Sequence, residues 1–143
     1  MTRCGVIPLV ALLLVSCGGG SQTSTRELIN PGDSLAAASR FGDLVFTAGH
    51  LPENGAQTGA GFPAQVNEVL DGLEATLKES GAGFDTLLKV NVYLTNWDNW
   101  DTFDTIYVQR IGRYGTPPRT TVEVSRLGYD ALIEIAAIAH VRR

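Results

Sequence analysis

Residues 131–141 constrain the fold more than any other part of the chain. Their alternation predicts a β-strand, yet both faces of that strand are apolar. Glu134 interrupts one face, which otherwise carries Leu132, Ala136 and Ile138, while the opposite face carries Ile133, Ile135, Ala137 and Ala139. Such a strand belongs inside a sheet that is covered on both sides.

The rest of the chain is too short to cover both faces. At 143 residues, 44% hydrophobic and with a net charge of −4, the sequence predicts one folded domain and excludes disorder or a second core. Two amphipathic segments can form helices, and two helices cover one face. We therefore expect the second face to meet another copy of the chain. Glu134 would then lie near a subunit interface, where desolvation raises its pKa. The alternative is a solvated glutamate on an edge strand.

The remaining pattern predicts an α+β fold with the order β-β-α-β-α-β-β, a mixed sheet packed by two helices. One helix is expected from Pro63 to Gly81, and the other from Asp98 to just before Gly115. The second helix has an apolar side of Trp100, Phe103, Tyr107 and Ile111. Strands are expected over residues 34–41, 44–48, 88–94, 119–126 and 131–141.

The N-terminus has the pattern of a bacterial lipoprotein. A basic start and an apolar run too short to span a bilayer predict a signal peptide over residues 1–16. The sequence Leu-Val-Ser-Cys over 14–17 resembles a lipobox, so we expect Cys17 to become the lipidated first residue. Residues 17–30 then form a flexible tether, and residues 31–143 form the domain. The alternative is a cleaved secretory signal with an incidental cysteine.

The tether also predicts a location. No acidic residue follows Cys17, a pattern typical of lipoproteins released to the outer membrane. We therefore expect a protein of the bacterial envelope, held by its lipid alone at the periplasmic face of that membrane.

Several classes of site lack support in the sequence. A sequence pI near 5.0 disfavours nucleic acid as a partner, because such binding depends on Lys and Arg meeting phosphates. His50 and His140 are far apart and have no neighbouring ligands, which excludes a metal motif, and neither lies near a nucleophile elbow. The glycines at 59–61 lack the Lys-Ser/Thr of a phosphate loop.

Arg119 is the candidate for ligand binding. It follows Pro117 and Pro118, whose restricted backbone would fix its position at the start of a strand. A guanidinium held there suits bidentate capture of a carboxylate. If the last two strands form a hairpin, Arg119 and Thr121 share a face with Glu134. The alternative for Arg119 is a surface ion pair.

Three segments carry a resemblance to a known family. Residues 117–127 (PPRTTVEVSRL) and 133–139 (IEIAAIA) resemble the C-terminal signature of the RidA/YjgF family of reactive-intermediate deaminases, and residues 46–50 (FTAGH) are similar to a turn of that family. The resemblance extends from Leu35 to Arg143. It implies a chorismate-mutase-like fold, a homotrimer with one cleft at each subunit interface, and no cofactor.

The resemblance also implies roles for individual residues. Arg119 matches the family's carboxylate-binding arginine, and Glu134 matches the glutamate that activates the hydrolytic water. Gly49 matches a glycine whose backbone lines the pocket, and Thr121 lies where the family has a small residue. The implied reaction is hydrolysis of an enamine or imine of the 2-imino acid type to a 2-oxo acid and ammonia.

Three positions depart from the family pattern. Leu35 replaces a pocket tyrosine, His50 replaces a glutamine, and Asp104 replaces an asparagine beside the cleft. A carboxylate at Asp104 would compete for Arg119 and repel an anionic substrate. We therefore expect a substrate that differs from those of cytosolic relatives and that carries a positive amine.

Two functions remain open at this stage. The first is a hydrolytic deaminase, and the second is a non-catalytic envelope trimer that binds a small ligand in a diverged pocket. The acidic composition disfavours a third function, the ribonuclease activity attributed to some relatives.

The predicted lipid anchor has a direct test. In a bacterial host, the protein is expected to incorporate labelled palmitate and to partition into a detergent phase. The variant Cys17→Ser should lose both properties, because the thiol that receives the lipid is gone. Unchanged labelling in this variant would show that Cys17 is not the attachment site.

Overall fold

The computed structural model describes residues 25–32, 35–52 and 59–142. The predicted signal peptide, Cys17 and the first part of the tether lie outside these residues. Within them, two α-helices and six strands occur in the order βββαβαββ. The helices are α1, Phe62–Glu79, and α2, Trp100–Ile111. No helix in this part of the chain is long and apolar enough to cross a membrane.

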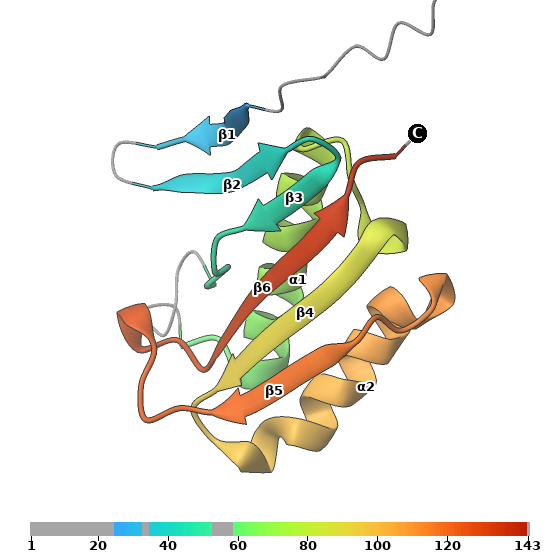
Figure 1. Cartoon of the computed structure of the whole chain (residues 1–143). Coiled ribbons are helices and arrows are strands. Elements are labelled where there is room, and N and C mark those ends of the chain that lie inside the picture. Colours follow the sequence, from blue (N-terminus) through green and yellow to red (C-terminus); the bar gives the residue numbers. More distant parts are fainter. Residues whose placement is uncertain (1–24, 33–34, 53–58, 143) are drawn as a thin grey trace, which may run out of the picture.

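The six strands form one mixed sheet, with the spatial order β1-β2-β3-β6-β4-β5 (Figure 1). Neighbouring strands in this sheet are antiparallel, except for β4 and β5, which are parallel. The strands are β1, Arg26–Pro31; β2, Ala36–Phe41; β3, Leu44–Thr47; β4, Leu87–Leu94; β5, Arg119–Glu123; and β6, Ile133–His140. The predicted α+β class, with a mixed sheet packed by two helices, is confirmed.

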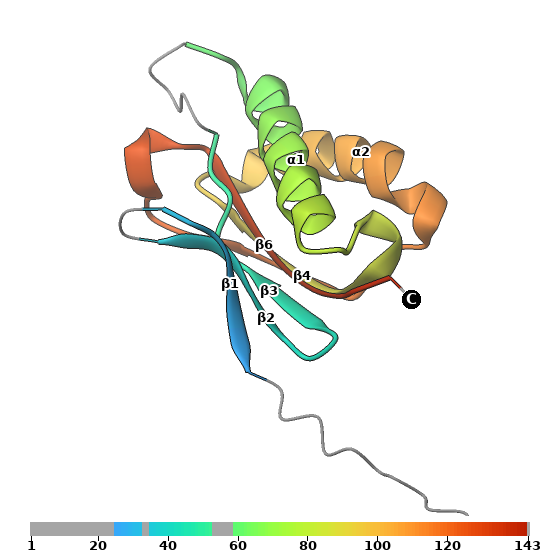
Figure 2. The ribbon, with the colours of Figure 1, turned by 90° about the horizontal axis from the view of Figure 1, so that it is seen from above.

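Both helices pack on the same side of the sheet (Figure 2). Helix α1 has Pro63 in its first turn and buries the stripe predicted from its spacing, which is Val66, Val69, Leu70, Leu73 and Leu77. It is followed by Gly81, whose φ of +79° suits a residue without a Cβ. On β6, Ile133, Ile135 and Ala139 face the helices and are fully buried.

Neither helix covers the opposite face, which we call the open face. Along β6, buried and partly exposed residues alternate, so every second side chain points to the open face. Large apolar side chains that are 40–53% exposed also lie on this face: Leu28, Phe41, Leu44, Phe46 and Val122. Exposed apolar side chains of this size are typical of a face that meets another protein.

Two predictions about the strands are wrong. Residues 26–31 form β1, which pairs with β2, so the sheet begins inside the segment predicted as tether over 17–30. The last two strands do not form a hairpin either, because β4 lies between β5 and β6. The strand–helix–strand unit β4-α2-β5 instead brings β5 back parallel to β4, the usual result of a helical crossover.

Candidate active site

Arg119 lies at the start of β5 and points toward α2. Its guanidinium carbon is 4.5–5.0 Å from the centres of three aromatic rings of that helix, and its Nη2 donates to Asp104 Oδ1 at 2.6 Å. The Arg119 side chain is only 14% exposed, against 41% for Asp104. The three rings are those of Trp100, Phe103 and Tyr107. Cation–π attraction and the ion pair together fix the orientation of the guanidinium.

Three polar atoms beside this cluster are buried without a hydrogen-bond partner: Arg119 Nη1, Tyr107 OH and Thr121 Oγ1. Buried polar groups in proteins are almost always paired, so an unpaired set of this kind is a candidate for contact with a ligand. Arg119 and Thr121 lie on the same face of β5, two residues apart. Each of the three groups can donate to an anion.

Burial raises the pKa of Tyr107 to about 12, against a smaller opposing effect of the Arg119 charge. Tyr107 therefore keeps its proton at neutral pH and can only donate to, never repel, a bound carboxylate.

Glu134 and Gly49 form a second group, on the open face. A Cβ at position 49 would overlap the Glu134 carboxylate, so this carboxylate lies directly against the backbone of Gly49. The neighbouring residue His50 pairs with Ile135 of β6 through backbone hydrogen bonds of 2.8 and 3.1 Å, which hold this segment against the strand. Desolvation raises the pKa of Glu134, as expected for a carboxyl that has no cationic partner among the described residues.

The two groups lie on opposite faces of the sheet. Glu134 is in register with Tyr93 of β4, whereas Thr121 is in register with Val92, and successive residues of a strand point to opposite sides. The prediction that Arg119 and Thr121 share a face with Glu134 is therefore wrong. It assumed a hairpin between strands that β4 separates. Within one chain, Arg119, Thr121 and Asp104 come together, and so do Gly49 and Glu134.

The two remaining departures from the family pattern lie apart from Arg119. Leu35 is 71% exposed and precedes β2, next to a hollow over β1, β2 and β3. His50 lies toward α1, where burial lowers its pKa and its Nε2 has no partner. It lines a cavity of about 520 Å³ together with Asn67 and Asp71. Within the described residues, no three potential ligands gather in an arrangement that could hold a metal ion.

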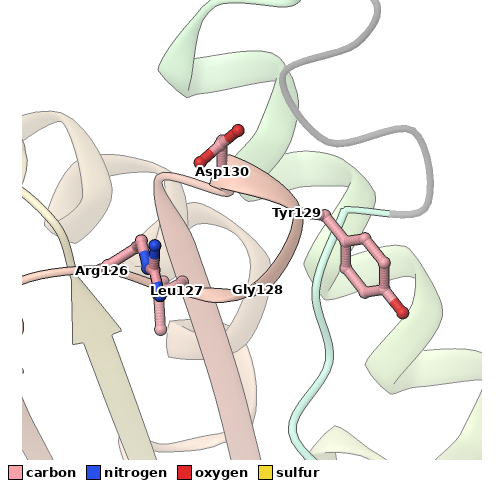
Figure 3. A pocket seen from close by; sticks show the side chains of 5 residues that line it. All are labelled: Arg126, Leu127, Gly128, Tyr129 and Asp130. Atoms are coloured by element: carbon pink, nitrogen blue, oxygen red, sulfur yellow. The ribbon is translucent and has the colours of Figure 1, made fainter.

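A further hollow, of about 420 Å³, lies against the connection between β5 and β6 and is lined by Arg126, Leu127, Gly128, Tyr129 and Asp130 (Figure 3). Tyr129 and Asp130 both have positive φ, of 57° and 55°, and Tyr129 is 75% exposed. None of the predicted site residues lines this hollow.

The aromatic rings around Arg119 were not predicted from the sequence. The prediction that Trp100, Phe103 and Tyr107 form the apolar side of a helix is correct, but it includes no contact with the arginine. The parallel β4-α2-β5 unit makes that connection, because it packs α2 against the strand that begins at Arg119. The strand–helix–strand pattern was the available signal.

Comparisons with known proteins agree with this fold. Residues 25–141 match the family described as Endoribonuclease L-PSP. A RutC family protein of Pyrococcus abyssi is 33% identical over 119 residues, which are 81% of this chain and 93% of that protein. The 2-iminobutanoate/2-iminopropanoate deaminase of Escherichia coli is 33% identical over 108 residues, 72% of this chain and 83% of that enzyme.

Solved structures give the same result. A Rid family protein of unknown function from Yersinia pestis superposes with a TM-score of 0.75 and 28% identity, covering 82% of this chain and 100% of that one. The YjgF gene product of E. coli superposes with a TM-score of 0.70 and 28% identity, and the match covers 78% of this chain and 91% of that one.

The contact between Gly49 and Glu134 generates a prediction about the carboxyl. In Gly49→Ala, the added Cβ should push the flexible end of Glu134 into solvent, so its raised pKa should fall toward the ordinary value. The free energy of unfolding, measured in urea, should change by less than about 1 kcal/mol, because only the end of one side chain moves. A pH titration of the Glu134 carboxyl by ¹³C NMR measures the shift.

Gly128→Ala is the matched control, since a Cβ there meets only Leu51 Cδ1 at 3.5 Å. It should leave the pKa of Glu134 unchanged. A Gly49→Ala protein with an unshifted Glu134 pKa would show that the glycine does not position this carboxyl.

Proposed function

Because the chain belongs to the RidA/YjgF family, we propose that it is a cofactor-independent deaminase of reactive enamines and imines, converting 2-imino acids to 2-oxo acids and ammonia. The observation that carries the proposal is the buried, unpaired Nη1 of Arg119, beside the unpaired hydroxyls of Tyr107 and Thr121. Donors of this kind suit the carboxylate of an imino acid. The similarity to the E. coli deaminase supports the reaction class.

We further propose that the active cleft lies between copies of the chain in a homotrimer. Arg119 and Glu134 lie on opposite faces of the sheet, so they can act on one ligand only if two copies supply them. The apolar open face around Glu134 needs a covering partner, and β5 is an edge strand that a neighbouring copy can approach.

In this cleft the chemistry needs only one carboxyl and water. As the water oxygen bonds to the imine carbon, Glu134 accepts one water proton and passes it to the nitrogen, which has received the C=N π electrons. Glu134, again ionised, then takes the proton of the new hydroxyl and delivers it to the amine nitrogen. The C–N bond breaks as the C=O bond forms, and the products are ammonia and a 2-oxo acid. One carboxyl can serve both steps if its pKa is near the working pH, and desolvation raises the pKa of Glu134 in that direction.

Asp104 shapes the substrate preference in this proposal. Its contact with Arg119 Nη2 at 2.6 Å leaves fewer donors of the guanidinium for a ligand and adds a negative charge beside the carboxylate position. A substrate that also carries a positive amine would offset this charge. We therefore propose an amine-bearing imino acid in place of the simplest ones.

A non-catalytic envelope trimer that binds a small ligand is the second candidate. The ion pair of Arg119 with Asp104 favours it, because the arginine is already partly engaged. Both candidate functions include the proposed lipid anchor at Cys17, which would hold the protein at the periplasmic face of the outer membrane. Neither includes nucleic acid, since a chain with a net charge of −4 has weak attraction for phosphates.

Ammonia release from 2-iminopropanoate generated in the assay tests the proposed activity. The wild type should release ammonia faster than the uncatalysed reaction, and Arg119→Ala should lower the rate by about 100-fold, because the carboxylate loses its anchor. Arg40→Ala, which removes a surface arginine paired with Glu27, is the control and should retain the rate.

Equal rates for wild type and Arg119→Ala would remove Arg119 from the mechanism. No release by either, with ligand binding retained, would favour the non-catalytic candidate.

Calorimetric binding of 2-oxopropanoate tests the role of Asp104. Asp104→Asn should strengthen binding about tenfold, because the negative charge that repels the ligand carboxylate is lost. The same change should weaken binding of an amine-bearing carboxylate. Unchanged affinity for both ligands would contradict the proposed preference.

A further inference from the structure

A second group of aromatic and acidic side chains lies at the start of α2 and shares only Trp100 with the surround of Arg119. The rings of Trp97 and Trp100 are stacked, with centres 5.1 Å apart and planes 9° from parallel. A hollow of about 300 Å³ lies beside them and is lined by these two tryptophans with Asp98 and Asp101. In Figure 1 this is the end of α2 that follows β4.

The two tryptophans differ in what holds them. Trp100 packs against the hydrophobic core and stacks on the Arg119 guanidinium at 4.8 Å, so its position is explained by folding. Trp97 is 47% exposed and lies outside that core. Leaving so large an apolar ring in water costs free energy that burial would recover, so folding alone does not explain this residue.

The exposed ring is nevertheless held in place. The backbone N–H of Trp97 donates to Glu123 Oε2 of β5 at 2.6 Å, and Asn96 Oδ1 accepts from the backbone N–H of Asp98 at 2.9 Å. These bonds fix the turn Trp97–Asn99 that precedes α2. The stacking on Trp100 then fixes the ring. A pre-organised aromatic face loses little conformational entropy when it binds a ligand.

The charge around this face is negative. Within the described residues, the carboxylates of Asp98 and Asp101 form no ion pair, and Arg119 on the far side of Trp100 is already paired with Asp104. The N-terminus of α2 contributes only about half a positive charge. Two carboxylates outweigh it, so the hollow attracts cations and repels the carboxylate ligands proposed for Arg119.

We infer that Trp97, Trp100, Asp98 and Asp101 form a binding site for a small organic cation of the alkylammonium class. An ammonium group with methyl substituents can rest on the tryptophan face, where the ring quadrupole attracts it, while the carboxylates supply the opposite charge. The inference does not depend on the deaminase activity, because Trp97, Asp98 and Asp101 have no part in the proposed reaction, and only Trp100 is shared with the surround of Arg119.

The site can be observed directly, because Trp97 and Trp100 are the two tryptophans of the whole chain. Tryptophan fluorescence of the protein therefore reports on this site and, through Trp100, on the surround of Arg119. Titration with tetramethylammonium chloride, at ionic strength held constant with NaCl, should give a saturable change with a dissociation constant on the order of millimolar.

Two variants test the residues. Asp98→Asn combined with Asp101→Asn keeps both fluorophores and should weaken binding about fivefold or more, because the opposite charge is lost. Trp97→Ala keeps Trp100 as the reporter and should abolish the saturable response. Glu27→Gln combined with Glu79→Gln removes the same charge from β1 and α1 and should bind as the wild type does.

Three results would overturn the inference. One is a response to tetramethylammonium no larger than the response to NaCl. Another is equal affinity in wild type and in the Asp98, Asp101 double variant. The third is equal or tighter binding of a neutral methyl glycoside, which would indicate a sugar platform instead of a cation site.

Discussion

The position of β4 between β5 and β6 is the constraint on which the rest of the structure depends. Since β4 is parallel to one neighbour and antiparallel to the other, its registers fix which side chains share a face. They place Arg119 with the helices and Glu134 on the open face. A ligand that needs both a guanidinium and a carboxyl therefore requires two copies of the chain, and the apolar open face provides the surface for their association.

The parts of this fold that could be predicted from sequence depend on local periodicity. The stripe of α1 and the alternation of β6 are visible as residue patterns, because a buried face imposes its period on the sequence. The order of strands in a sheet depends on contacts between distant parts of the chain, so it cannot be read from a local pattern. The assumption that the last two strands pair as a hairpin placed Arg119 on the wrong face of the sheet relative to Glu134. Residues 26–31 were not predicted as a strand because their apolar and polar residues do not alternate and because they follow a Gly-rich and Ser-rich segment. Their backbone nevertheless pairs with β2.

Helix α2 presents opposite chemistry at two neighbouring places. Around Arg119, aromatic rings and Asp104 hold a cation of the chain itself, and unpaired donors remain for an anion. One turn earlier, Trp97 stacks on the Trp100 ring beside Asp98 and Asp101, whose carboxylates form no ion pair within the described residues. The first arrangement is a filled version of the second, which supports the view that the outer tryptophan face accepts a cation from solution.

Subunit complementation tests the shared cleft most directly. Arg119→Ala and Glu134→Ala proteins, each inactive alone, are unfolded together, refolded as an equal mixture and assayed for ammonia release. A cleft built from two copies predicts recovery of about one quarter of the wild-type rate, because random assembly gives that share of clefts an intact Arg119 and an intact Glu134. No recovery in a mixture shown to contain mixed oligomers would contradict the account, since it would mean that each chain supplies both residues to its own site.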